Sequence, residues 1–239
     1  MDKGKSSATE LPSLGTLLAN SVDLYKQGWR LYVWLITLPL LASILVVAVV
    51  GAVIAAVLAV SGGDLTPDRI PWLIPPALVG IIGLVIVNAI GKIALIKAIS
   101  LDGVSTIREL LTFSRPLVWK FFWLQILTGL AVFVGFLLLV IPGIVFSTWF
   151  LFSTIILVIE GTDGTAAMKR SKFYARGKFW GLFGRMLALM IIVIIFSVLG
   201  SSVENQTFNL LVQLFSTLVI APIASIYTFK LYQGAKAAS

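Results

Sequence analysis

The residues that could do chemistry in this chain are its carboxylates and its basic side chains, because it has no histidine and no cysteine. These two absences exclude imidazole acid–base catalysis, thiolate chemistry, disulfides and the commonest zinc ligands. The ten acids all lie at the ends of apolar runs or between them, and their spacing brings no set of carboxylates together. We therefore expect no enzymatic activity, no cofactor and no metal site.

Basic side chains form the densest candidate binding group. Half of the ten residues from 169 to 178 are basic, namely Lys169, Arg170, Lys172, Arg176 and Lys178. In a helix, Lys169, Lys172 and Arg176 share one face. Such a cluster beside a membrane span attracts anionic lipid head groups by about 1 kcal/mol per residue. Two interpretations stay open: the cluster only orients the protein in the membrane, or it also contacts an anionic lipid or a protein partner.

The composition places these residues in a membrane protein. Hydrophobic residues make up 59% of the 239 positions and charged residues 12%, whereas soluble domains carry about 25% charged residues. There is too little polar surface to cover a soluble globule, so much of the surface must face lipid. We predict an all-α, polytopic membrane helical bundle that forms a single domain over residues 1–239.

The number of spans depends on one long uncharged run. Phe121 to Ile159 is almost twice the length of about 20 residues that crosses a bilayer. Pro142-Gly143 near its middle predicts a turn, although one kinked helix is the alternative. Glu160 is predicted to close the span after the turn, as a helix cap or a local ion pair. The turn gives six spans in three hairpins, at about 31–60, 72–99, 119–140, 144–160, 180–203 and 207–230.

Charge placement favours the turn. With it, Arg69 is the single exception among eighteen Lys and Arg residues that otherwise fall on one side of the membrane. The positive-inside rule then predicts cytoplasmic N- and C-termini in a multi-pass protein of the cytoplasmic membrane. Without the turn, the basic residues from Lys169 to Arg185 would move to the opposite side.

A basic, aromatic segment precedes each hairpin, which indicates a threefold repeat. Interfacial amphipathic helices are predicted at about 12–28, 104–116 and 163–177. Aligning Ser21 with Ser171 places Lys26 on Arg176 and also superposes two aromatic residues. Each unit would then be a surface helix followed by a hairpin. Chance similarity among basic-aromatic boundaries is the alternative.

The segment from Leu139 to Trp180 carries a family resemblance. It contains Ile-Pro-Gly at 141–143, Glu160, Ala-Met-Lys-Arg-Ser at 167–171 and Gly-Lys-Phe-Trp at 177–180. It resembles the membrane domain of some bacterial glycerophosphoryl diester phosphodiesterases and related stand-alone multispan proteins. The resemblance implies a multispan membrane domain. The soluble catalytic barrel of the fused enzymes has no counterpart here, so their activity is not implied.

Two functions fit these features. The first is a non-enzymatic scaffold or accessory protein whose basic cytoplasmic face contacts anionic membrane lipids or a protein partner in the envelope. The alternative is a transporter or permease for a small solute or lipid. A closed polar cavity lined by Asn88, Gln125 or Gln213 would favour transport, whereas a solid apolar bundle with an exposed basic shelf would favour the scaffold. Nucleic acid is not an expected partner, because the basic cluster is held at a membrane surface.

Overall fold

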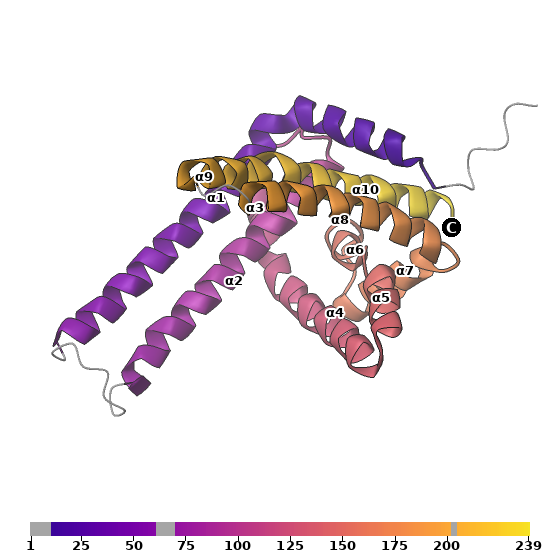
Figure 1. Cartoon of the computed structure of the whole chain (residues 1–239). Coiled ribbons are helices and arrows are strands. Elements are labelled where there is room, and N and C mark those ends of the chain that lie inside the picture. Colours follow the sequence, from indigo (N-terminus) through magenta and orange to yellow (C-terminus); the bar gives the residue numbers. More distant parts are fainter. Residues whose placement is uncertain (1–10, 61–69, 202–204) are drawn as a thin grey trace, which may run out of the picture.

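The fold consists of three helical hairpins joined by surface helices (Figure 1). The computed structural model describes residues 11–60, 70–201 and 205–239, and Arg69 lies outside these ranges. No strand occurs among the described residues. The hairpin helices are α1 (Leu14–Val60), α2 (Ile70–Ser100), α4 (Val118–Leu138), α5 (Val140–Trp149), α6 (Ser153–Glu160), α8 (Phe179–Ser201), α9 (Gln206–Phe215) and α10 (Ala221–Ala237). The predicted all-α class is confirmed.

Six helical segments are long and apolar enough to cross a membrane. In the second hairpin α5 and α6 together make one span. In the third, a π-helical turn called η2 (Ser216–Ile220) joins α9 to α10 within the last span. The protein is therefore a multi-pass integral membrane protein.

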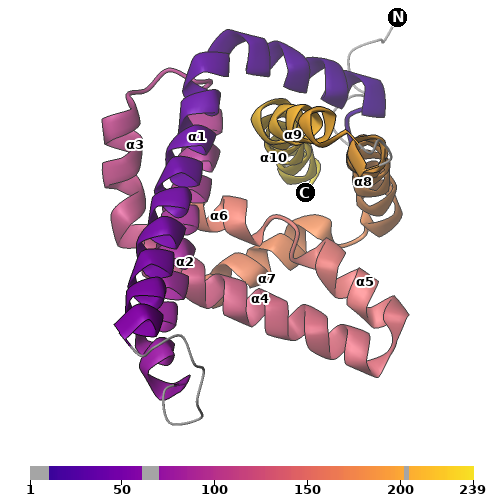
Figure 2. The same cartoon turned by 60° about the vertical axis from the view of Figure 1, so that its left-hand side comes forward.

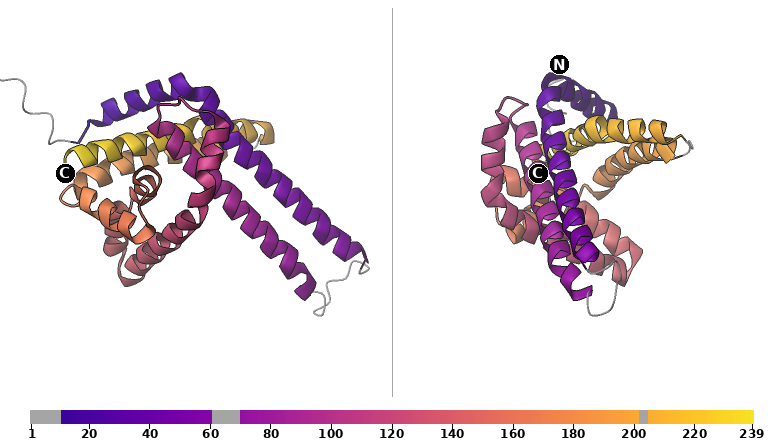
Figure 3. Two further views of the ribbon diagram at one scale, coloured as in Figure 1. Left: turned by 180° about the vertical axis from the view of Figure 1, so that it is seen from behind. Right: turned by 90° about the vertical axis from the view of Figure 1, so that its left-hand side faces the viewer.

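The three hairpins share a core at one end and diverge toward their tips (Figures 1 and 2). The largest fully buried side chains include Tyr32, Ile93, Leu124, Phe152 and Tyr227, which come from all three hairpins. Toward the tips, residues such as Val53, Leu78, Leu137 and Leu211 are exposed. Figure 3 shows the same divergence from two further directions. The distal halves of the spans therefore present apolar surface to lipid.

The surface helices link the hairpins into a closed ring. The start of α1 packs on α10 and η2 in the third hairpin. Helix α3 (Ile107–Ser114), followed by the 3₁₀ turn η1 (Arg115–Leu117), packs on α2 in the first hairpin. Helix α7 (Gly164–Ala175) packs on α4, α5 and α6 in the second. Each surface helix thus covers the hairpin that comes before it in the ring.

Each of the three surface helices packs on its hairpin through a buried serine. Ser21, Ser114 and Ser171 are fully buried. The residues one helical turn earlier are Leu17, Leu110 and Ala167, which are buried as well. Small buried serines let a helix approach its neighbour closely. The three surface helices therefore share a register, which supports the predicted repeat.

Helix α1 changes direction at Gly28, which has non-helical backbone angles (φ −113°, ψ 17°). A Cβ at this position would lie 2.9 Å from the Tyr32 ring, so the close packing requires glycine. The surface segment of α1 therefore ends at Gly28, the boundary predicted for the first interfacial helix. Pro39 stays within the helix, where its ring packs against Gly91 of α2.

The second hairpin reverses at Leu139, three residues before the predicted turn. Leu139 is extended (φ −168°, ψ 156°) between α4 and α5. Pro142 lies in the first turn of α5, where its missing N–H removes no helical hydrogen bond. Gly143 packs against Phe136, and a Cβ there would overlap the phenyl ring. The hairpin is confirmed, and its Pro-Gly pair serves helix initiation and close packing instead of the reversal.

Candidate functional site

Helix α7 carries the predicted basic cluster and is positioned by its local sequence. Helix α6 ends at Gly161, whose positive φ of 64° suits glycine. Asp163 then takes the extended backbone of an N-cap residue and α7 begins. Ala167, Ser171 and Ala175 recur at a four-residue spacing and are all buried. This narrow face seats α7 on the second hairpin.

The exposed basic row consists of Lys169 and Lys172 on the outward side of α7 and of Arg176, the extended C-cap residue just past its end. The Lys172 amino group lies 4.2 Å from the centroid of the Trp149 ring, which is a cation–π contact. Phe173 follows Lys172 in α7 and is 62% exposed. Within the described chain, none of the three forms an ion pair. The basic row therefore combines uncompensated positive charge with an exposed aromatic ring.

Arg170 differs from the basic row because it is committed to an internal contact. Its guanidinium donates to Glu160 Oε2 at 2.5 Å. This hydrogen bond raises the pKa of Arg170 above its usual value. The other carboxylate oxygen of Glu160 accepts from Lys236 and Tyr232, both at 2.7 Å, and from Tyr174 at 3.2 Å. These five residues, here called the Glu160 cluster, join α6, α7 and α10.

Lys178 is also structural. Its amino group donates to the Ala235 carbonyl at 2.9 Å and to the Ser239 hydroxyl at 3.1 Å. Burial lowers the pKa of this amino group. Because Ala235 lies in the last turn of α10, Lys178 satisfies a carbonyl that has no helical partner. Of the five predicted contact residues, three face outward and two hold the fold together.

The acids close to α7 are already paired. Asp163 bonds Lys120 at 2.8 Å, and Glu160 is shared by Arg170 and Lys236. The Glu160 side chain is only 8% exposed. Glu160 is the last residue of α6 and acts as an ion-pair partner. Within the described ranges, no carboxylate forms an ion pair with the basic row.

Ser171 provides hydrogen-bond partners for backbone groups at a break in the fourth span. Between α5 and α6 the helix is interrupted, and the Ser171 hydroxyl donates to the Trp149 carbonyl at 2.6 Å. The same oxygen accepts from the Phe152 amide at 3.1 Å. Backbone groups released at membrane depth must find partners inside the protein. The surface helix α7 therefore supplies the hydrogen-bond partners that these backbone groups would have found in a continuous helix. The sequence did not predict this contact.

In the last span, too, a side chain of a surface helix bonds a backbone group that lacks its helical partner. Pro222 has no N–H for the Leu218 carbonyl, the acceptor four residues earlier. The Tyr25 hydroxyl, from the surface segment of α1, donates to that carbonyl at 3.0 Å. The π turn η2 lies at this point. Two of the three surface helices thus stabilise breaks in the spans that they cover.

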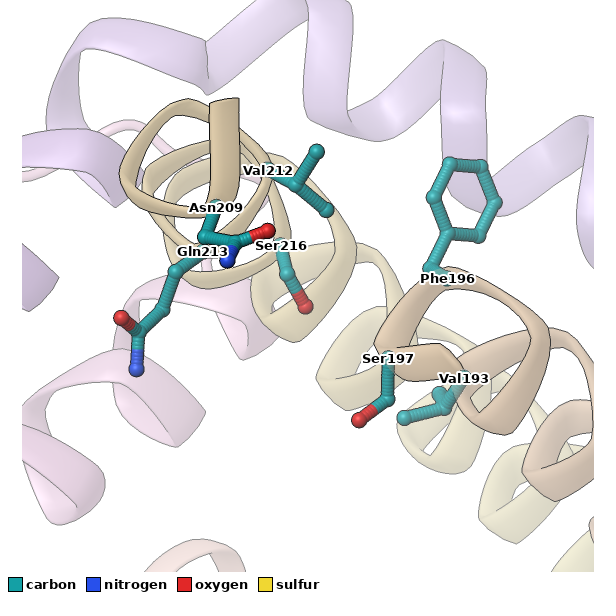
Figure 4. Close-up of a pocket in the computed structure, with 7 residues that line it drawn as sticks. All are labelled: Val193, Phe196, Ser197, Asn209, Val212, Gln213 and Ser216. Atoms are coloured by element: carbon teal, nitrogen blue, oxygen red, sulfur yellow. The ribbon is translucent and has the colours of Figure 1, made fainter. Parts of the chain in front are cut away.

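The polar side chains considered for transport do not meet in one place. Asn88 and Gln125 line an open, mostly apolar groove between α2 and α4. Gln213 lines a separate pocket of about 410 Å³ with Asn209, Ser197 and Ser216, between α8 and the last span (Figure 4). Thr154 donates to Gln125 at 3.3 Å, and Thr148 bonds the Ile144 carbonyl within its own helix. Several of these groups therefore serve helix packing.

Among the described residues, no three Asp or Glu side chains are close enough to hold a metal ion. Comparisons with protein-family models, with curated proteins and with solved structures found no match for this chain. The function is therefore argued from the geometry of α7 and its surroundings.

Proposed function

We propose that this integral membrane protein is a non-enzymatic scaffold or accessory protein that binds anionic lipid head groups through the basic row of α7. One observation carries the proposal: Lys169, Lys172 and Arg176 are exposed and have no carboxylate partner in the described part of the chain, while Glu160 and Asp163 are paired with other residues. Lipid phosphates supply the missing negative charge at a membrane surface.

The aromatic residues beside the basic row support an interfacial position. Phe173 and Trp180 are strongly exposed, although both are large and apolar. Amphipathic helices at the head-group layer combine such rings with basic side chains. Under this proposal α7 lies at the cytoplasmic surface of the cytoplasmic membrane, with both chain termini on the same side. A membrane protein that binds the same basic row is the second kind of partner that this surface suits.

Native mass spectrometry tests the lipid contact. The purified protein is mixed with phosphatidylglycerol and phosphatidylcholine, and the retained lipids are counted for wild type, K169Q/K172Q/R176Q and K169R/K172R/R176K. Arg170 is left unchanged because its loss would break the Glu160 cluster. We expect the Gln variant to lose phosphatidylglycerol selectively and the charge-retaining variant to keep it. Equal retention by all three proteins would reject the proposal.

Transport is the second candidate, supported by the polar pocket in the third hairpin. The Oδ1 atom of Asn209 is buried there without a hydrogen-bond partner among the described residues. The pocket also borders the π turn η2, and such turns are frequent at functional sites. Conversely, no charged residue is fully buried in the described part of the chain, although coupled transporters usually place ionisable groups inside the bilayer.

A lipid-flipping assay separates the two candidates. The protein is reconstituted into vesicles that contain a fluorescent phospholipid, and a membrane-impermeant reductant bleaches the outer leaflet. A scaffold leaves about half of the fluorescence protected, as in protein-free vesicles. Loss of that protection, restored by N209L/Q213L, would favour transport through the polar pocket.

A further inference from the structure

A groove lies between α2 and α4, away from α7. Its volume is about 950 Å³. The two helices belong to different hairpins and diverge from a common apex (Figure 1). Apolar side chains form most of its walls, including Ile82, Val85 and Ile86 from α2 and Phe122 and Ile126 from α4. A groove of this kind, open to the bilayer, suits acyl chains.

Two basic side chains line the same groove. Lys92 comes from α2 and Arg115 from η1, and both are exposed. Neither forms an ion pair or a hydrogen bond with another described residue. Among the residues that the structure describes, no acid lines the groove. The cavity thus has apolar walls and an unbalanced positive charge, which matches a lipid with an anionic head group.

The placement of these two cations fits a head-group phosphate. Lys92 precedes the end of α2 at Ser100 by eight residues, which is about 12 Å along the helix axis. A lysine at that depth is held below the helix end and needs either a path to water or an anionic partner. Trp119 lies on the groove and is strongly exposed, as expected of an aromatic ring near the interface.

Amide groups at the groove complete the polar part of the cavity. The Asn88 amide nitrogen donates to the Ser43 hydroxyl and the Leu84 carbonyl, so its oxygen is available as an acceptor. The Gln125 oxygen accepts from Thr154, so its nitrogen is available as a donor. Glycerol hydroxyls and ester carbonyls are partners for such groups. The polar and apolar parts therefore follow the order of a glycerophospholipid.

We propose that the α2–α4 groove is a discrete binding site for one anionic glycerophospholipid, with its phosphate held by Lys92 and Arg115 and its acyl chains along the apolar walls. The site extends the lipid chemistry of the proposed function to a surface that contains no residue of α7. The Lys97 amino group lies 4.8 Å from the Phe113 ring centroid and fixes α3 against α2 beside the basic end. This contact holds in place the segment from α3 to η1, which carries Arg115.

The test uses one charge variant and one filling variant, each with a matched control. The charge variant is K92Q/R115Q, and its control is K169Q/K172Q on α7. The filling variant is V85W, which places an indole in the groove. Its control is V79W, at an exposed valine of α2 that does not line the groove. Size-exclusion elution and thermal unfolding in detergent first establish that each variant is folded.

Native mass spectrometry with phosphatidylglycerol and phosphatidylcholine then measures lipid affinity. We expect K92Q/R115Q to weaken phosphatidylglycerol binding at the groove by about 25-fold, the product of two contacts of roughly fivefold each. V85W should abolish that binding, whereas V79W should leave it unchanged.

Three outcomes would overturn the groove site. Loss of phosphatidylglycerol only in K169Q/K172Q would restrict lipid binding to α7 and uphold the proposed function alone. If K92Q/R115Q lost phosphatidylglycerol binding and V85W did not, the two cations would attract the lipid from the surface without its acyl chains entering the groove. Equal losses for phosphatidylcholine, whose phosphate is balanced by its choline cation, would show that the net negative charge of the head group plays no part. If only the groove variants lose lipid, the groove site stands and the proposed role of α7 fails.

Discussion

Lys236 donates to Glu160 at 2.7 Å across 76 positions of the chain. The pair closes the Glu160 cluster, in which Arg170 binds the other carboxylate oxygen. Two hairpins, through α6 and α10, and the surface helix α7 therefore meet at one nearly buried acid. The two cations are each about half exposed, so solvent screens part of their attraction. The contact fixes α7 on the core and leaves its basic row outside.

Replacing Glu160 by Gln should destabilise the protein more than replacing Asp163 by Asn. The first change leaves Arg170 and Lys236 without a carboxylate and costs about 2 kcal/mol. Asp163 bonds only Lys120, and both side chains are well exposed, so its loss costs at most about 1 kcal/mol. Thermal unfolding of the two variants in the same detergent compares them. Similar shifts would show that the Glu160 cluster has no special role.

Ser171→Ala should lower the unfolding temperature, whereas Ser21→Ala and Ser114→Ala should lower it little. Loss of the Ser171 hydroxyl leaves two backbone groups of the fourth span unpaired, which costs about 2 kcal/mol. The other two hydroxyls donate only to Leu17 and Leu110 within their own helices. We expect less than about 1 kcal/mol for each of these. The bridging role of Ser171 would be refuted by three equal shifts.

Gly143→Ala should disturb the second hairpin because the new methyl group overlaps the Phe136 ring. Overpacking of this kind costs about 1–3 kcal/mol. Gly129→Ala is the matched control in the same hairpin, since no atom lies within 4 Å of its Cβ position. That change should stabilise α4 by up to about 1 kcal/mol through helix propensity. Opposite shifts in the unfolding temperature are expected, and a stable Gly143→Ala protein would contradict the close α4–α5 packing.

Single cysteines test the orientation, and the chain has none of its own. Thr165→Cys at the start of α7 and Ser239→Cys at the C-terminus should be protected from a membrane-impermeant maleimide in intact cells. Thr66→Cys, between the first two spans, should react. Permeabilised cells provide the control for reactivity. Labelling of Thr165→Cys in intact cells would place α7 outside and reverse the predicted orientation.

The spans and hairpins could be predicted because hydrophobic length and charge placement are local properties of the chain. The breaks inside the spans could not be predicted, since the exposed backbone groups are bonded by side chains that are distant in the sequence. Ser171 bonds residues 19 and 22 positions away, and Tyr25 bonds Leu218 across 193 positions. A Pro-Gly pair signals a turn, but the extended residue is Leu139 because Pro142 suits the first turn of a helix.

The basic cluster shows the same limit. Composition and helical spacing identified all five residues and placed Lys169, Lys172 and Arg176 on one face. They could not separate this basic row from Arg170 and Lys178, because that distinction depends on Glu160 and on the end of α10. The groove between α2 and α4 was also beyond prediction, since it forms where two hairpins diverge.

Lipid contact at Phe173 tests the proposed function most directly, because this residue is exposed next to Lys172 of the basic row. Phe173→Cys carries a fluorophore, and the protein is placed in bilayers that contain either brominated phosphatidylglycerol or brominated phosphatidylcholine in the same mole fraction. The account predicts stronger quenching by the brominated phosphatidylglycerol, and loss of this preference when K169Q/K172Q/R176Q is added. Equal quenching by both lipids with the basic row intact would contradict it.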